Sequence, residues 1–330
     1  MRKLCLLLIV ASLLSAREAE GQQKFLMGYS SFSSNQTALW VAKEESLFKR
    51  YGSDPDLILI EGGTRGAQAL ISGDMPIMSM SGQPVISARA RGSDLTMIAG
   101  VVNKLNYILV GAPSVKRVEE LKGKRIGAAQ AGTASYHAVL LGLKHWGIDP
   151  RRDRVTILQL GNQGARVASL QSGGSDAIIV NPGLGMSLKE RGNNLLADFT
   201  ELPIPYPQQT LSVRERTIKA EPDFVDRVLK GVLAGNSFSL EPKNKERVKQ
   251  IIAKYLRLDK VEKAEEHYQS VLKVLTPKPY VDFAGIASMI DFIAESDALV
   301  AKLKPEMVVN HAILKRLDDS GFIDQLNKPR

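Results

Sequence analysis

Short apolar runs alternate with amphipathic segments through the first part of this 330-residue chain. The runs have the length of buried strands and lie at 25–29, 57–60, 77–81 and 95–102. Between the first two runs, Trp40, Leu47 and Tyr51 fall on one face of an expected helix. The run 57–60 is wholly apolar, as expected when both faces of a sheet are covered. This alternation predicts parallel, doubly wound α/β sheets.

The same local pattern occurs twice. Gly63 to Gly73 contains a glycine turn, a short expected helix and a glycine stop, and a buried strand follows. Gly161 to Gly173 repeats that order before the apolar run 176–180. Similarity at one long period indicates internal duplication. Two matched units predict two lobes with a ligand-binding cleft between them.

The rest of the chain suggests how these lobes are connected. A strand expected at 107–110 leaves the first lobe, and Pro203, Pro205 and Pro207 mark the return. From Ile218 onward the pattern is largely helical. We therefore expect lobe I to comprise residues 22–108 and 207–330, and lobe II to comprise residues 109–206.

The first residues have the layout of a secretory signal. A positive start is followed by the mostly apolar segment 4–16 and the polar segment 17–21, with cleavage expected after Ala16 or Gly21. The apolar segment is shorter than the roughly twenty residues that span a bilayer. Cys5, the only cysteine, lies inside it and not at its end, where a lipid would be attached. We expect residues 1–21 to be removed and a soluble, unlipidated protein without disulfides to reach the periplasm or the extracellular space.

The formal net charge is +9, of which residues 1–21 contribute +1. Basic side chains gather at 151–154, in an expected turn, and at 243–249, along an expected helix. Neither run is interleaved with stacking aromatic residues, so a solvated basic face is favoured over a nucleic-acid surface. The positive net charge favours an anionic ligand only slightly.

Five loops are expected at the mouth of the cleft, because ligands of α/β sheets lie beyond the carboxyl ends of the strands. They are 30–35, 62–64, 79–83, 132–136 and 181–182, and they are rich in Ser, Thr, Asn and Gly. Short hydroxyls and free backbone N–H groups at a helix start suit a carboxylate, sulfonate or phosphate. The candidate ligand-binding residues are Ser31, Phe32, Ser33, Asn35, Gly63, Thr64, Ser81, Gly82, Gly132, Thr133, Ser135, Tyr136, Gln163, Asn181 and Tyr206.

Several of these residues have a structural alternative. The segment 132–135 is the best candidate for an anion cradle, although Thr133 or Ser135 could serve only to cap its helix. The aromatic candidates Phe32, Tyr136 and Tyr206 could stack on a flat ligand or be buried against a neighbouring loop. Tyr107 is expected to pack in the hinge and His137 to lie on a helix surface. Gln163 corresponds to Arg65 in the repeat, and either could reach the cleft.

No catalytic constellation is visible. The histidines form no metal-ligand pair with cysteine and no H-E-x-x-H run, and neither a G-x-S-x-G elbow nor a dinucleotide loop is present. We expect a binding protein with no metal, no cofactor and no catalytic residue.

At family level, the chain resembles the substrate-binding proteins of ABC importers, in the branch that includes sulfonate/taurine binders and thiamine-pyrimidine-precursor binders. The segments that carry the resemblance are 38–48, 61–63, 69–74 and 121–127. The resemblance implies a periplasmic binding protein type II-like fold: two α/β lobes joined by a two-strand hinge, with a helical C-terminal part. It also implies a small-molecule ligand, cleft closure and ABC permease subunits as partners. We expect a monomer.

Two other functions remain open. One is an enzyme of the thiamine-pyrimidine-synthase type, although the cysteine cluster of those enzymes has no counterpart here once residues 1–21 are removed. The other is a sensory receptor that presents its ligand to a membrane kinase. The polar loops suit sulfonates, carboxylates, pyrimidines and amino-acid derivatives alike, so the sequence does not identify the ligand.

Overall fold

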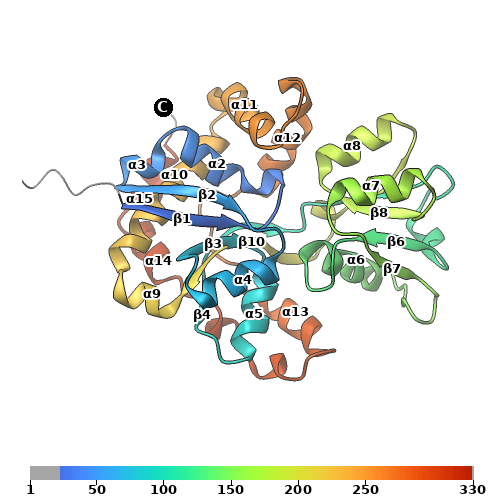
Figure 1. Cartoon of the computed structure of the whole chain (residues 1–330), viewed down its shortest axis with the longest axis horizontal. Helices are drawn as coiled ribbons and strands as arrows, with labels where there is room; N and C mark the ends of the chain where they lie inside the picture. Colours follow the sequence, from blue (N-terminus) through green and yellow to red (C-terminus); the bar gives the residue numbers. More distant parts are fainter. Residues whose placement is uncertain (1–22, 329–330) are drawn as a thin grey trace, which may run out of the picture.

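The computed structural model describes residues 23–328, in which two lobes each surround one five-stranded sheet (Figure 1). The expected signal at 1–21 lies outside the described residues. The first sheet has the order β2–β1–β3–β10–β4. Its strands are β1 (Gln23–Tyr29), β2 (Ser53–Leu59), β3 (Ile77–Met80), β4 (Leu95–Lys104) and β10 (Pro205–Arg214).

The second sheet has the corresponding order β7–β6–β8–β5–β9. Its strands are β5 (Ile108–Gly111), β6 (Arg125–Ala128), β7 (Thr156–Gln159), β8 (Ala177–Val180) and β9 (Asn194–Asp198). The α/β fold in two lobes is therefore confirmed.

Both sheets are mixed, so the prediction of parallel sheets is wrong in part. β1 runs parallel to β2 and β3, and β6 runs parallel to β7 and β8. β10 pairs antiparallel with β3 and β4, and β5 pairs antiparallel with β8 and β9. β5 and β10 are the strands that begin immediately after the chain has crossed from one lobe to the other. Each of these two strands begins at the hinge and runs away from it, whereas the strands of the repeated strand–helix units run towards the hinge.

Helices cover the sheets and form the C-terminal part. The α-helices of the first two thirds are α2 (Thr37–Glu44), α3 (Leu47–Arg50), α4 (Gly63–Ser72), α5 (Gly82–Ala90), α6 (Ala134–His145), α7 (Gln163–Gln171) and α8 (Pro182–Glu190). The later ones are α9 (Glu215–Ala220), α10 (Pro222–Leu240), α11 (Lys245–Tyr255), α12 (Glu265–Val274), α13 (Phe283–Ala294), α14 (Ala312–Asp319) and α15 (Phe322–Leu326). Short 3-10 helices are η1 (Ser34–Gln36), η2 (Val118–Leu121), η3 (Phe199–Glu201), η4 (Pro242–Asn244), η5 (Val261–Ala264), η6 (Val300–Lys302) and η7 (Pro305–Met307). The helical C-terminal part expected from Ile218 onward is confirmed.

The sequence repeat corresponds to a structural repeat. The units β2–α4–β3 and β7–α7–β8 both contain a strand, a glycine turn, a short helix and a second strand. Leu70 and Leu170 are buried at matching helix positions. Gly73 and Gly173 follow the helices with φ of 90° and 72°, a left-handed conformation that glycine adopts without a steric penalty.

Apolar side chains fill both faces of the first sheet. Trp40 on α2 and Val228 on α10 are buried with Met27 against one face. Leu70 on α4 is buried with Met78 against the other face. Full coverage does not extend to β2, contrary to expectation: Ile58 and Leu59 are 37% and 39% exposed because β2 is the outermost strand.

The lobes are joined by two crossing segments, 105–107 and 202–204. The first connects β4 to β5, and the second connects η3 to β10. The division expected from the sequence placed its boundaries at 108/109 and 206/207. Further contacts come from the C-terminal helices. On α12, His267 lies against Gly183 of α8, and on the far side of the hinge Lys144 of α6 pairs with Glu295 at 2.7 Å.

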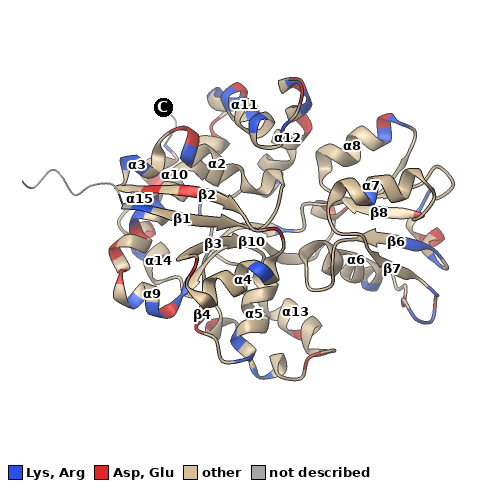
Figure 2. Cartoon of the chain, viewed as in Figure 1, with Lys and Arg blue, Asp and Glu red and all other residues tan. Residues whose placement is uncertain are grey.

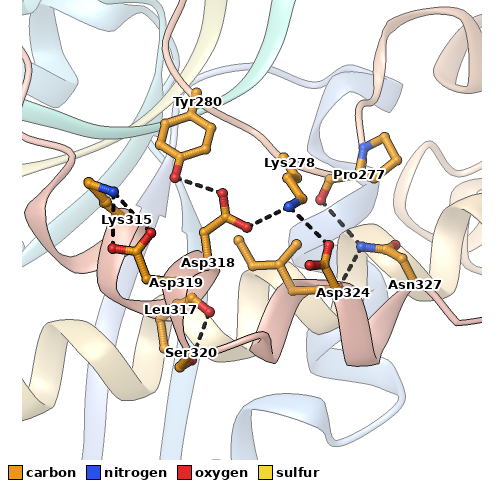
Figure 3. Close-up of polar contacts among 11 residues, drawn as sticks. Pro277, Lys278, Tyr280, Lys315, Leu317, Asp318, Asp319, Ser320, Asp324 and Asn327 are labelled. Carbon is orange, nitrogen blue, oxygen red and sulfur yellow. Dashed lines mark hydrogen bonds and ion pairs between the residues drawn. The ribbon is translucent and has the colours of Figure 1, made fainter.

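The loop between α12 and α13 is fixed to the end of the chain by a polar cluster (Figure 3). Lys278 Nζ lies 2.7 Å from Asp318 Oδ1 and 2.9 Å from Asp324 Oδ1, and the Tyr280 hydroxyl donates to Asp318 Oδ2 at 2.9 Å. The helices α12 and α13 contact lobe II. The cluster therefore anchors the loop that connects these two helices to lobe I.

Charged side chains are distributed over both lobes (Figure 2). The expected solvated basic face at 243–249 is only partly present, because Lys249 is 8% exposed and pairs with Glu246 and Glu265. Arg247 pairs with Glu45 of lobe I, so this stretch binds acidic neighbours within the chain. Within residues 23–328, no helix has the length and apolarity required to cross a bilayer.

Candidate functional site

A polar cavity of about 510 Å³ lies between the lobes, at the carboxyl ends of the strands. Lobe I contributes the loops after β1, β2 and β3, and lobe II contributes those after β6, β7 and β8. Both crossing regions reach the cavity as well, through Tyr107 and through Gln208 and Gln209. A molecule in this cavity would touch both lobes and the hinge at once.

Most of the residues singled out from the sequence line this cavity. They are Ser31, Phe32, Ser33, Asn35, Gly63, Thr64, Ser81, Thr133, Ser135, Gln163 and Asn181. The structure therefore brings together side chains from all five expected loops. Their contact with a ligand stays a prediction.

Four candidates do not line the cavity: Gly82, Gly132, Tyr136 and Tyr206. Gly82 is buried at the start of α5, and Tyr136 is partly buried against the core that extends between the lobes. Gly132 lies at the cavity's edge, where a Cβ atom would be 3.8 Å from the side chains of Thr64 and Gln83 in the opposite lobe. The lobes therefore approach each other closely at this point.

Tyr206 is the candidate whose position differs most from the one expected from the sequence. It is only 1% exposed, and its hydroxyl lies 3.4 Å from His137 Nδ1. His137 is itself buried between Tyr206 and Phe292, so the expectation of a surface histidine is wrong. Burial lowers the pKa of His137 to about 4, which keeps the imidazole neutral near pH 7. The pair forms part of the packing between α6, β10 and α13.

The expected anion cradle lies at the start of α6. The Thr133 hydroxyl accepts from the Tyr136 N–H at 3.4 Å, so Thr133 caps the helix. The Ser135 hydroxyl accepts from the Ala129 N–H at 3.2 Å and lies 3.4 Å from the Thr133 hydroxyl. Local hydrogen bonds thus fix both hydroxyls beside the positive end of the helix dipole, where an anion is favoured.

The most informative lining residue is Arg166 on α7, which the sequence analysis missed. Its side chain is buried, with the residue 5% exposed. Nη1 donates to the Ile179 carbonyl at 2.6 Å, and Nε lies 3.4 Å from the Asn162 carbonyl. Among the described residues, no carboxylate pairs with this guanidinium within ion-pair distance, and the Glu61 carboxylate, which also lines the cavity, acts on it from farther away. The remaining N–H groups are available to an anion in the cavity.

The charge state of Arg166 follows from its surroundings. Burial lowers the pKa of the guanidinium, and the negative charge of the Glu61 carboxylate acts in the opposite direction. An arginine starts from a pKa far above neutrality, so the group remains positive. A buried cation without a carboxylate partner is costly, and an anionic ligand would compensate that cost. The sequence held one signal for Arg166: it precedes the buried Leu170 by four residues and therefore shares its helix face.

Buried amides position the lobe I side of the cavity. Gln209 Nε2 donates to the Ser79 hydroxyl at 2.6 Å, and that hydroxyl donates to Gln36 Oε1 at 2.9 Å. Gln36 Nε2 donates in turn to the Ser31 hydroxyl at 3.1 Å. Ser31 is therefore held in place through a chain of hydrogen bonds that starts on β10. Gln36 and Gln209 are buried polar residues that sequence periodicity did not identify.

The lobe II side is fixed in a similar way. Asn162 caps α7 by accepting from the Ala165 N–H at 3.0 Å, and Gln163 Oε1 accepts from the Asn181 N–H at 2.7 Å. The Gln163 amide N–H groups remain available to the cavity.

The described residues contain no group of three or more His, Cys, Asp or Glu side chains placed to hold a metal ion. The charged residues that line the cavity are Arg65, Arg166 and Glu61, so Arg65 reaches the cavity as Gln163 does. With two cations against one carboxylate, the arrangement can donate hydrogen bonds and a net positive charge to a small, anionic molecule.

Comparison with known proteins identifies the family of this chain. The model of the family described as "NMT1/THI5 like" matches residues 33–245. The taurine-binding periplasmic protein of Escherichia coli (strain K12) is 30% identical over 143 residues, a match that spans 42% of this chain and 43% of that protein. The alignment therefore covers less than half the length of that relative.

Solved structures share the whole fold. One is the alkanesulfonate-binding protein SsuA from Xanthomonas axonopodis pv. citri bound to MOPS, with a TM-score of 0.69, 20% identity, and coverage of 87% of this chain and 98% of that one. Another is the periplasmic nitrate-binding protein NrtA from Synechocystis PCC 6803, with a TM-score of 0.70, 13% identity, and coverage of 94% and 92%. The two-lobed architecture is thus that of periplasmic binding proteins.

Proposed function

The chain belongs to the NMT1/THI5-like family, and from this premise we propose that it is the extracytoplasmic solute-binding component of an ABC importer. Its ligand is a small organic anion, bound between the lobes. The observation that carries this proposal is the buried Arg166 guanidinium, which faces an interlobe cavity without a carboxylate partner. The names of the relatives, which bind taurine, alkanesulfonates and nitrate, support a small ligand with an anionic group.

The binding mechanism follows from where the lining residues come from. Arg166 and Ser135 belong to lobe II, and Ser31 and Thr64 belong to lobe I. A ligand that contacts both sets stabilises the closed arrangement, because these contacts are not available together when the lobes are apart. The permease subunits would then recognise the closed form. The protein acts as an exported monomer that binds its solute without catalysis.

The test has two steps. Native mass spectrometry of the protein, purified from its own periplasm without denaturation, should reveal one small-molecule adduct, whose mass identifies the ligand. Calorimetric titration of ligand-free protein should then detect binding of ethanesulfonate, taurine or nitrate, and none of dimethyl sulfone, which is neutral. Both steps need a buffer free of sulfonates, since a sulfonate buffer occupies a protein of this fold. A bare protein that binds none of the three anions at 10 mM would overturn the proposal.

A further inference from the structure

We propose that Tyr107, on the first crossing segment, is a ligand-contacting and specificity-determining residue, whose hydroxyl donates a hydrogen bond to the anionic group held by Arg166. This inference rests on the proposed function, because it assigns a residue to the same interlobe site. It concerns the hinge, whereas all five loops expected to bind the ligand belong to the lobes.

The position of Tyr107 follows from the connection between the sheets. β4 of lobe I ends at Lys104 and β5 of lobe II begins at Ile108, so Tyr107 is the last residue of the crossing segment. Its carbonyl accepts from the Phe199 N–H at 2.9 Å, which ties the crossing segment to the start of η3. Its partly exposed side chain lines the cavity. The backbone is thus fixed while the ring faces the site.

A single buried amide orients the hydroxyl. Gln208 of β10 is 3% exposed, accepts from the Asn106 N–H through Oε1, and lines the same cavity as Tyr107, where its side chain lowers the pKa of the Tyr107 hydroxyl as a hydrogen-bond partner. This interaction favours the ionised form of the tyrosine, as a hydrogen bond donated by the Gln208 amide N–H to the tyrosine oxygen does, so the tyrosine oxygen is the acceptor in it. The phenolic proton is then available to a ligand in the cavity that Tyr107 lines. Asn106 continues this network into lobe I by donating to Asn35 Oδ1 at 2.7 Å.

The chemistry of the hydroxyl suits an anion. Burial raises the pKa of Tyr107, so the group stays protonated at physiological pH and remains a donor. The Arg166 guanidinium is close enough to affect that pKa electrostatically. A carboxylate or sulfonate beside Arg166 would therefore meet a second donor from the hinge. A neutral ligand would gain less, because hydrogen bonds to charged groups are the stronger ones.

The chain offers a matched control. Tyr206 is also a tyrosine near a crossing segment, but its hydroxyl faces His137 in the core and lies outside the cavity. The experiment compares wild type, Tyr107→Phe and Tyr206→Phe by calorimetric titration with ethanesulfonate. We expect Tyr107→Phe to weaken binding by about tenfold or more, from the loss of one hydrogen bond to a charged group, and Tyr206→Phe to leave affinity unchanged.

The role of Gln208 as a positioning residue is tested by a double-mutant cycle. Gln208→Leu should weaken ethanesulfonate binding in the wild-type background and have little further effect in the Tyr107→Phe background, because its influence passes through the hydroxyl. Equal losses in both backgrounds would mean that Gln208 acts independently of Tyr107, through the fold or through its own place on the cavity wall, and would overturn this part of the inference.

The outcomes separate the two proposals. Wild-type affinity in Tyr107→Phe, together with loss of binding in an Arg166 variant, would overturn the Tyr107 assignment and leave the proposed function standing. Equal weakening by Tyr107→Phe and Tyr206→Phe would also overturn it, because the effect would then come from the packing of the hinge. If neither wild type nor Tyr206→Phe bound ethanesulfonate, taurine or nitrate, the proposed function itself would fail, and the Tyr107 assignment with it.

Discussion

Replacing Arg166 by methionine separates the binding role of this side chain from a structural one. Methionine keeps an unbranched, flexible apolar chain in place of the first part of the arginine side chain, but it carries no charge and no donors. The guanidinium is buried, its hydrogen-bond acceptors in the protein are two backbone carbonyls, and its charge has no carboxylate partner in the described chain. The substitution should therefore weaken affinity without lowering the stability of the empty protein.

The magnitudes follow from these contacts. Arg166→Met removes at least one hydrogen bond between charged groups in the complex, worth about 1.5–3 kcal/mol, so affinity for ethanesulfonate should fall by roughly 10- to 150-fold. In the empty protein, two hydrogen bonds to carbonyls are lost, at about 1 kcal/mol each. Against that loss stands the relief of a desolvated charge, which amounts to several kcal/mol for a buried ion. The empty variant should be as stable as wild type or more stable.

The assay combines calorimetric titration with urea unfolding of the ligand-free protein at pH 7. Arg91→Met is the control, because it also removes one positive charge but lies outside the cavity, where Arg91 pairs with Asp297 at 2.8 Å. Its affinity should equal that of wild type. If Arg166→Met kept wild-type affinity while losing more than about 2 kcal/mol of unfolding free energy, Arg166 would be a structural residue and the reasoning would be refuted.

Three other substitutions test the fold and the site. Ser135→Phe should abolish binding of ethanesulfonate without unfolding the protein, because the ring would fill the start of α6; wild-type affinity would contradict the cradle. Gly235→Ala should cost about 3 kcal/mol or prevent folding, since its Cβ would lie 2.1 Å from the Ala38 carbonyl, and a urea midpoint equal to that of wild type would exclude this close helix contact. His137 has a folded pKa of about 4, below its ordinary value near 6.5, so its contribution to stability is complete above about pH 6.5 and is lost as the pH falls towards 4. The loss is on the order of 3 kcal/mol. Burial also lowers the pKa of His267 to about 4, so His137→Phe should reduce, and not abolish, the fall in urea midpoint between pH 7 and pH 4.5; an unchanged slope would mean that His137 does not contribute to it.

Much of the architecture could be predicted from local patterns. Strand-length apolar runs, glycine stops and the repeated Gly63 and Gly161 segments gave two α/β units, because burial and left-handed turns leave a direct mark on the sequence. No local pattern in the sequence indicates that β5 and β10 run antiparallel to their neighbours. Whether a strand runs parallel or antiparallel depends on where the chain enters the sheet, which is a property of the whole path.

The site divides in the same way. Polar loops at strand ends can be read from the sequence, since the carboxyl ends of parallel strands share one edge of a sheet. Tyr206 and Tyr107 could not be told apart, because side-chain direction near a crossing segment is set by how the lobes pack against each other. The sequence alone favoured Tyr206 for the cleft and Tyr107 for hinge packing, and the structure places Tyr206 in the core and Tyr107 at the cavity.

By itself, the sequence determined the two-lobed α/β fold, the helical C-terminal part and the polar character of the cleft. Each of these follows from short-range periodicity, turn chemistry or composition. Only the tertiary structure decided that Arg166 is a buried cation facing the cavity, that His137 is buried and that Gln208 links both crossing regions. The physical reason is that burial and electrostatic pairing depend on which residues far apart in the chain become neighbours, and one-dimensional patterns do not contain that information.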